Sequence, residues 1–245
     1  MRRVLFRWRS IDVWSYSAML YIGLLTGVVA GNVASHRAGI DPLRTYVATM
    51  VLIVAALAGG RLLFVITHWN SYVGWRRALL GRKSGGASMY GGLVLALAVS
   101  VPLLRLLRLR FGAFWDGATF TMLTGMIFVR VGCLLNGCCQ GKPSDGKLTL
   151  LLPDVNGVWE PRVPTQIYEA GLGVLLLAGA IAGWRWMTFP GELFLLVLAA
   201  YSAARFAIEF GRQQEQGQHR LREGHAMSAI LFTSSFCALT FRWLK

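Results

Sequence analysis

Long apolar runs alternate with short polar or basic segments along the chain. Most of these runs reach the roughly 18 to 20 residues that an α-helix needs to cross a bilayer. They predict helices over residues 13–33, 46–67, 89–107, 114–135, 167–187, 191–210 and 226–243. We therefore expect an all-α polytopic membrane protein with about seven transmembrane helices. These helices are expected to form a single integral membrane domain over residues 1–245.

The composition agrees with this pattern. Hydrophobic residues make up 55% of the chain, and the mean hydropathy is +0.52. The net charge of +14 comes from 25 Lys and Arg residues against 11 Asp and Glu residues. Basic loops held against anionic lipid headgroups explain this excess. The expected partner of the basic loops is therefore the lipid bilayer and not a nucleic acid.

Residues 142–163 interrupt the series of apolar runs. Strand-forming residues occur at 148–152, and the turn formers Pro153, Asp154, Asn156 and Gly157 come directly after them. This segment therefore predicts an extramembrane loop that folds as a small hairpin.

An arginine lies near the end of the fourth apolar run. Residues 119–129 before it are apolar, so Arg130 is placed within or at the edge of the hydrocarbon layer. An unpaired charge there costs about 2.5 kcal/mol or more, which predicts an anionic partner for Arg130. Asn136 and Gly141 follow in the glycine-containing segment after this run.

Four polar side chains recur along the sixth run. Tyr201, Arg205, Glu209 and Arg212 follow one another at spacings of four, four and three, which predicts that they share one helical face. One interpretation is an arginine–carboxylate ladder that locks two helices together. The other is a polar cavity, where Glu209 holds the guanidinium groups and the remaining positive charge binds an anion such as phosphate.

Three of the four cysteines are close in sequence. Cys133, Cys138 and Cys139 cluster, whereas Cys237 lies far away. Their spacing matches no standard set of zinc ligands, so no metal is expected. A disulfide between Cys133 and Cys138 is one alternative, although the sequence does not establish the approach that it needs. The other is that these small side chains only pack at a helix end.

Glycines accompany two further polar residues. Tyr90 precedes Gly91 and Gly92 at the start of the third run, where glycine permits tight turns and close backbone approach. The tyrosine hydroxyl is expected either at a functional site or in the interfacial belt of aromatic side chains. Arg61 follows two glycines late in the second run. It either serves the site or extends to the membrane interface.

Residues 164–170 open the fifth run with a helix-start signature. Thr165 is expected to cap the helix, and Glu169 falls in its early turns. Capping alone accounts for most of this motif.

Taken in order, these motifs resemble one family of membrane enzymes. The segments concerned are WSYSAMLY with Tyr16, GGR ending at Arg61, YGGL from Tyr90, RVGCLLNGCCQG from Arg130, PTQIYEA from Pro164, and the face from Tyr201 to Arg212. Together they span nearly the whole chain, which is similar to prolipoprotein diacylglyceryl transferase. The resemblance implies a seven-helix enzyme of the bacterial inner membrane, with its active site on the periplasmic side. It implies transfer of diacylglycerol from phosphatidylglycerol to the thiol of a lipobox cysteine, which leaves a thioether and glycerol phosphate. It implies no metal and no organic cofactor.

Three positions depart from the pattern of that family. Tyr90 stands for histidine in its His-Gly-Gly motif, Cys133 for asparagine in Gly-Asn, and Cys138 for glutamate in Asn-Gly-Glu. Deprotonation of the acceptor thiol then needs another base, either Tyr90 beside an arginine or a Cys138 thiolate. Alternatively, Cys138 itself receives the glyceryl group.

Site residues are assigned on this basis. The expected catalytic residues are Arg130, Arg205, Tyr90 and Cys138, of which the two arginines bind the headgroup phosphate and stabilise its departure. The expected substrate-binding residues are Tyr16, Arg61, Gly91, Gly92, Cys133, Asn136, Gly141, Tyr201, Glu209 and Arg212. The expected substrates are phosphatidylglycerol, or a related anionic phospholipid, and a prolipoprotein lipobox cysteine. The alternatives are a divergent member with another headgroup or acceptor, and a non-catalytic phospholipid-binding membrane protein.

Overall fold

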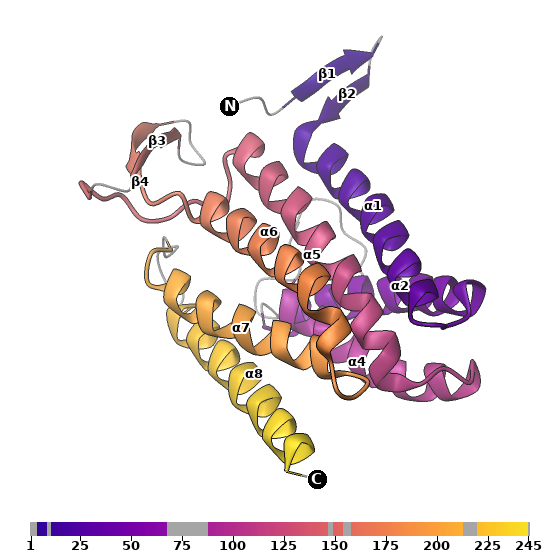
Figure 1. Cartoon of the computed structure of the whole chain (residues 1–245). Helices are drawn as coiled ribbons and strands as arrows, with labels where there is room; N and C mark the ends of the chain where they lie inside the picture. Colours follow the sequence, from indigo (N-terminus) through magenta and orange to yellow (C-terminus); the bar gives the residue numbers. More distant parts are fainter. Residues whose placement is uncertain are drawn as a thin grey trace. The chain divides into compact units, whose positions relative to one another are not determined.

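Every predicted apolar run forms a helix in the computed structural model, which describes residues 4–8, 11–67, 88–146, 149–153, 158–212 and 220–244. The helices are α1 (Ser15–Arg37), α2 (Pro42–Thr67), α4 (Met89–Leu106), α5 (Phe111–Asn136), α6 (Thr165–Gly183), α7 (Glu192–Glu209) and α8 (Arg220–Trp243) (Figure 1). A short 3-10 helix, η2 (Trp184–Trp186), extends α6. The expectation of an all-α polytopic membrane protein is confirmed.

Five of these helices are long and apolar enough to cross a membrane, namely α1, α2, α5, α6 and α8. Among the described residues, α4 has an apolar stretch over Gly91–Leu106. In α7 the charged side chains of Glu192, Arg205 and Glu209 interrupt the apolar sequence. α7 therefore differs from the five long apolar helices in its charge.

The described chain packs as two units, and each is treated by itself. Unit 1 contains Met1–Ala34 and Trp115–Lys245, and unit 2 contains Ser35–Phe114. Within unit 1, buried Ala34, Phe120, Leu123, Ala180 and Leu193 form an apolar core. The single membrane domain over residues 1–245 and the extramembrane position of residues 142–163 stay predictions.

Small residues let α1 approach α5 within unit 1. Gly23, Gly27 and Gly31 follow one another at intervals of four residues, so they share one face of α1. A Cβ atom added at Gly27 would lie 2.7 Å from the carbonyl oxygen of Thr121, and one at Gly23 would lie 2.8 Å from Cβ of Phe128. This is the small-residue packing that membrane helices use in place of a hydrophobic driving force.

Two carboxylates fix the start of α7 to its neighbours. Asp116 on α5 accepts hydrogen bonds from the backbone N–H of Gly191 at 2.7 Å and of Phe194 at 3.0 Å. Glu192 accepts a hydrogen bond from Nε1 of Trp243, on α8, at 2.9 Å. α7 and α8 pack side by side (Figure 1). The helix that carries Arg205 is therefore held to α5 and α8 at its far end.

Unit 2 is built on a close crossing of α2 and α4. A Cβ atom added at Gly59 would lie 2.4 Å from the carbonyl oxygen of Gly91, and one at Gly91 would lie equally close to that of Gly59. Ser88 caps α4 by accepting a hydrogen bond from the N–H of Gly91. Tyr90 falls in the first turn of α4, which confirms that the glycine-rich segment opens a helix.

Two antiparallel hairpins complete the described structure. The strands β3 (Leu150–Pro153) and β4 (Trp159–Arg162) confirm the predicted hairpin, although its turn at residues 154–157 lies outside the described residues. The strands β1 (Val4–Trp8) and β2 (Ile11–Trp14) precede α1 and were not predicted (Figure 1). Across β1 and β2, Arg7 and Asp12 form an ion pair at 2.5 Å.

Candidate active site

Charged side chains from α5, α6 and α7 meet inside unit 1. Nη1 of Arg205 lies 2.9 Å from Oε1 of Glu169, and Arg130 pairs with Oε2 of the same carboxylate. On α7, Nη2 of Arg205 lies 2.8 Å from Oε2 of Glu209 one turn further along. We call Arg130, Glu169, Arg205 and Glu209 the arginine–carboxylate cluster. The anionic partner predicted for Arg130 is therefore Glu169.

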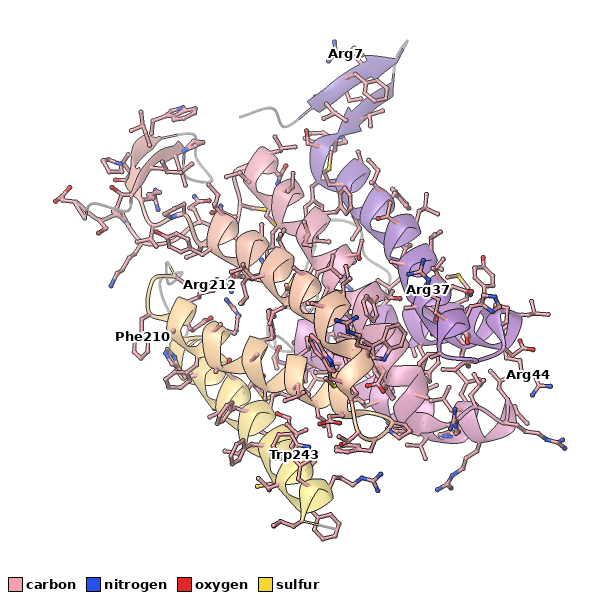
Figure 2. The ribbon with its side chains drawn as sticks, viewed as in Figure 1. Arg7, Arg37, Arg44, Phe210, Arg212 and Trp243 are labelled. Atoms are coloured by element: carbon pink, nitrogen blue, oxygen red, sulfur yellow. The ribbon has the colours of Figure 1, made fainter. Side chains whose placement is uncertain are left out.

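Arg212 lies near this cluster, but it does not lie on the helical face predicted for it. α7 ends at Glu209, so Arg212 lies beyond the helix (Figure 2) and pairs through its backbone with Gly141. The prediction that it continues the helical face of Arg205 is wrong, because the chain turns out of the helix before it. Its Nη2 nevertheless lies 4.0 Å from Oε1 of Glu169.

The four side chains of the cluster balance in charge and are buried, and Arg212 beside them adds one positive charge. The exposed fraction is 1% for Glu169, 5% for Arg205 and 6% for Glu209. With Arg212, three guanidinium groups face two carboxylates, which leaves one positive charge at this place. Nε of Arg130 and Nε of Arg205 are buried and have no hydrogen-bond partner among the described residues. Such donors suit an anion with several oxygen atoms.

Glu169 is the residue that the sequence argument missed. The sequence around it predicts a capped helix start, but the N-cap of α6 is Pro164 and no side chain caps the helix. Instead, Glu169 is one turn inside α6 and bridges Arg130 of α5 and Arg205 of α7. A carboxylate this early in an apolar helix was a usable signal, since burial of an unpaired charge in a membrane is costly.

The start of α6 also holds the loop that follows α5. The hydroxyl of Thr165 donates to the carbonyl oxygen of Cys139 at 2.8 Å, and Nε2 of Gln166 donates to that of Cys138 at 2.8 Å. The expected capping role of Thr165 is therefore wrong, because its hydroxyl is used between two segments. Both side chains are buried, with exposed fractions of 0% and 1%.

The three clustered cysteines come together at this loop. Cys133 is buried near the end of α5, Cys138 is half-buried and Cys139 is exposed. Their sulfur atoms all lie within 4.8 Å of one another, and all three are free thiols. Hydrogen bonds from Cys133 and Cys138 hold the pKa of the Cys139 thiol well below its ordinary value, and the charges of Arg212 and Arg130 act in the same direction. We call these three residues the cysteine cluster.

Gly141 joins three segments at the edge of the site. Its N–H donates to the carbonyl oxygen of Val163 at 2.9 Å, and the N–H of Lys142 donates to that of Gly211 at 2.9 Å. A Cβ atom at Gly141 would lie 2.5 Å from each of these two oxygens. Buried Arg162, which the sequence argument did not single out, donates to the carbonyl oxygen of Gly141. A residue without a side chain is therefore needed at Gly141, because the backbone at Val163 and at Gly211 lies close to it.

The remaining predicted site residues divide between the two units. Tyr16 interacts electrostatically with the cysteine cluster and with Arg130, Tyr201 interacts with Arg130, and Asn136 contacts Cys138. Unit 1 therefore brings together Tyr16, Arg130, Cys133, Asn136, Cys138, Gly141, Tyr201, Arg205, Glu209 and Arg212. Unit 2 contains Arg61, Tyr90, Gly91 and Gly92 at the crossing of α2 and α4. The side chain of Tyr90 lies outside the described residues.

Helices of this kind, with a buried arginine–carboxylate cluster and a further arginine beside it, define a multi-pass membrane protein suited to an anionic group. The sequence matches the family model for prolipoprotein diacylglyceryl transferase over residues 3–241. The chain therefore belongs to that family.

Three relatives illustrate how evenly the similarity is spread. All three are phosphatidylglycerol–prolipoprotein diacylglyceryl transferases. The one from Clostridium tetani is 27% identical over 251 residues, which cover 98% of this chain and 93% of the relative. The one from Geobacter sulfurreducens is 28% identical over 232 residues, with coverage of 93% and 88%. A second clostridial enzyme, numbered 2 in Clostridium perfringens, is 25% identical over 224 residues, with coverage of 89% and 86%.

Proposed function

We propose that this protein transfers the diacylglyceryl group of phosphatidylglycerol to the lipobox cysteine of a prolipoprotein. Membership of the family and the names of its relatives support the reaction. The observation that carries the proposal is the buried arginine–carboxylate cluster, beside which Arg212 leaves one surplus positive charge. We further propose that the protein resides in the bacterial inner membrane, as a multi-pass protein.

Together with Arg212, the cluster has the charge needed to balance the phosphate of the donor lipid. A phosphodiester carries one negative charge, which matches the surplus left when three guanidinium groups face two carboxylates. Glu169 holds Arg130 and Arg205 at a fixed separation, because each of them contacts a different oxygen of its carboxylate. Two guanidinium groups fixed in this way offer planar, paired donors to phosphate oxygens.

The same groups assist the chemical step. The sulfur of the acceptor thiolate attacks the glyceryl carbon of phosphatidylglycerol and forms a carbon–sulfur bond. The carbon–oxygen bond to phosphate breaks, and its electron pair leaves on glycerol phosphate, while the thiol proton passes to a base. Negative charge therefore grows on the phosphate as the bond breaks. A donor fixed in advance toward such growing charge contributes ~10²–10³ in rate.

We assign the binding of the acceptor thiol to the cysteine cluster. Cys133 follows Arg130 by three residues on α5, so the cysteine cluster begins one helical turn from a phosphate-binding arginine. Tyr90 and Cys138 remain the candidate bases. Cys138 is half-buried, as a group that must meet an incoming substrate needs to be.

The test is a mass-spectrometric assay in liposomes that contain phosphatidylglycerol and a lipobox peptide. We expect the peptide to gain the mass of one diacylglyceryl group while an equal amount of glycerol phosphate is released. Liposomes of phosphatidylcholine alone serve as the donor control, and the Clostridium tetani relative serves as the enzyme control. An unmodified peptide in the presence of an active relative would contradict the proposal. A gain in mass on Cys138 of the protein itself would instead identify another acceptor.

A further inference from the structure

The proposed reaction gives a role to Cys138 as a candidate base, but it does not explain why three cysteines lie together. Three free thiols lie together, with all sulfur atoms within 4.8 Å of one another. One thiol is buried, one is half-buried and one is exposed, so the group lies where the protein interior meets the surface. Packing at a helix end needs small side chains, but it does not need three sulfur atoms within 4.8 Å of one another.

Backbone geometry brings the sulfur atoms together. Gly137 and Cys139 have φ angles of 73° and 60°, which turn the chain back toward the end of α5. The N–H of Cys138 donates to the carbonyl oxygen of Cys133 at 3.1 Å. The left-handed conformation is uncommon for a residue with a side chain, and it persists only where surrounding contacts hold it. Here the hydrogen bond from Thr165 to the carbonyl oxygen of Cys139 supplies such a contact.

The spacing suits a thiophilic metal ion after a small adjustment. A zinc–sulfur bond of about 2.3 Å in tetrahedral geometry separates the sulfur atoms by roughly 3.8 Å, so each pair would close by about 1 Å at most. Three protein ligands leave one position open, which is the arrangement of catalytic rather than structural zinc sites. The expectation of no metal rested on the C-x4-C-C spacing, which lacks the paired spacing of standard zinc motifs.

Charge around the cluster favours such a site. Three thiolates and one divalent ion carry a net charge of −1. Arg212 and Arg130 both interact electrostatically with Cys139, so positive charge lies beside the sulfur atoms. The arginines thus compensate the thiolate ligands without supplying a ligand themselves.

We propose that Cys133, Cys138 and Cys139 bind a zinc ion whose fourth position takes the acceptor thiol of the transfer reaction. The metal site rests on the cluster alone, whereas its use by the acceptor rests on the proposed function. A thiol that coordinates zinc loses its proton, which passes to solvent water. The metal-bound sulfur then attacks the glyceryl carbon, and the phosphate leaves with the electron pair of the broken carbon–oxygen bond. Zinc would in this way replace the histidine and glutamate that the departures at Tyr90 and Cys138 remove, and Cys138 would act as a ligand and not as the base.

Metal analysis of the purified full-length protein tests the site without reference to activity. The protein is kept under reductant, loaded with zinc sulfate and desalted, and its zinc is measured by mass spectrometry. We expect about one zinc ion per chain in the wild type and in Cys237→Ser, and less than about one tenth in Cys138→Ser and in Cys139→Ser. Cobalt(II) in place of zinc should give a thiolate-to-metal absorption band that Cys139→Ser lacks.

Two outcomes would overturn the metal site. One is wild-type protein that remains free of zinc after loading, with all its thiols titratable or with two of them lost to a disulfide. The other is equal zinc in Cys139→Ser and Cys237→Ser, since Cys237 lies on α8, outside the cluster. Phosphatidylglycerol binding by each variant, measured by native mass spectrometry, shows whether the protein remains folded.

The role of the metal is tested separately. Removal of zinc by a chelator is expected to slow transfer to the lipobox peptide by about 10²-fold while phosphatidylglycerol binding is retained, and added zinc should restore the rate. If the zinc-free protein transfers at the rate of the loaded protein, the fourth position does not serve the acceptor. If the loaded protein binds zinc but transfers nothing while a relative does, the proposed function and the acceptor role fail and the metal site stands.

Discussion

The arginine–carboxylate cluster and the cysteine cluster start one turn apart on α5, yet they are built differently. In the first, every charged side chain comes from a helix and meets its partner on a helix. In the second, only Cys133 is helical, and the other two sulfur atoms come from a loop with two left-handed residues. A site built on helices holds its groups rigidly, whereas a site on a loop adjusts to what binds. This difference between the two clusters suits the proposed reaction, in which the departing phosphate is held in a fixed position and the acceptor varies.

Loss of Arg205 should have the largest effect, because it removes the guanidinium group at the centre of the first cluster. Arg205→Ala is expected to lower the transfer rate by about 10²–10³-fold. Arg212→Ala is the matched control, since Arg212 lies 4.0 Å from Glu169 and is more exposed. It removes the surplus positive charge but keeps the buried guanidinium groups of Arg130 and Arg205, so it should lower the rate by less than about tenfold. Equal losses in the two variants would show that general positive charge matters, and not the rigid helical cluster.

Glu169→Gln keeps the shape of the side chain and removes its charge. Arg130 and Arg205 would then lose the carboxylate that joins α5 to α7. We expect the free energy of unfolding to fall by about 3 kcal/mol, because breaking a buried ion pair leaves charge without compensation. Denaturant unfolding in detergent micelles measures this change. Wild-type stability together with a wild-type rate would mean that the ion pairs do not organise the cluster.

Gly141→Ala probes the backbone that supports the cysteine loop. The added Cβ would lie 2.5 Å from two carbonyl oxygens, so at least one of three adjoining segments has to move. The expected loss of stability is about 1–3 kcal/mol, typical of overpacking. Gly146→Ala is the control, because its nearest neighbour is the Ser144 hydroxyl at 3.4 Å. Similar thermal unfolding of the two variants would argue against a tight junction at Gly141.

Gly224→Ala should give the smallest effect and acts only through Glu209. Its Cβ would lie 2.6 Å from Oε1 of Glu209, the carboxylate that holds Arg205 on α7. We expect the transfer rate to fall by up to about tenfold, since a carboxylate end is able to shift. Gly179→Ala, with nothing within 4 Å of its Cβ, is the control. A rate loss equal to that of Arg205→Ala would mean that α8 shapes the cluster directly.

The helices were largely predictable, because apolar length alone defines a membrane span. The predicted run 89–107 became α4 at Met89–Leu106, and the run 191–210 became α7 at Glu192–Glu209. The need for an anion beside Arg130 was also predictable from the cost of a buried charge. Its identity was not, since Glu169 is 39 residues away in a motif that also reads as a helix start.

Features that depend on loop conformation were not predictable from the sequence. The proximity of three sulfur atoms depends on positive φ angles at Gly137 and Cys139. In the sequence, only the glycine indicates such a backbone conformation. Arg212 was assigned to a helical face because spacing does not tell where α7 ends. The hairpin of β1 and β2 extends to Trp14, at the start of the predicted run 13–33, where no strand was predicted.

The most direct test of the central claim is product formation in Arg205→Ala and Arg212→Ala beside the wild type. Modified lipobox peptide and released glycerol phosphate are counted together over time in phosphatidylglycerol liposomes. We expect equal amounts of both products in the wild type, a rate within about tenfold of it in Arg212→Ala, and a rate about 10²–10³-fold lower in Arg205→Ala while that protein remains folded. Formation of both products by folded Arg205→Ala at the wild-type rate would contradict this expectation.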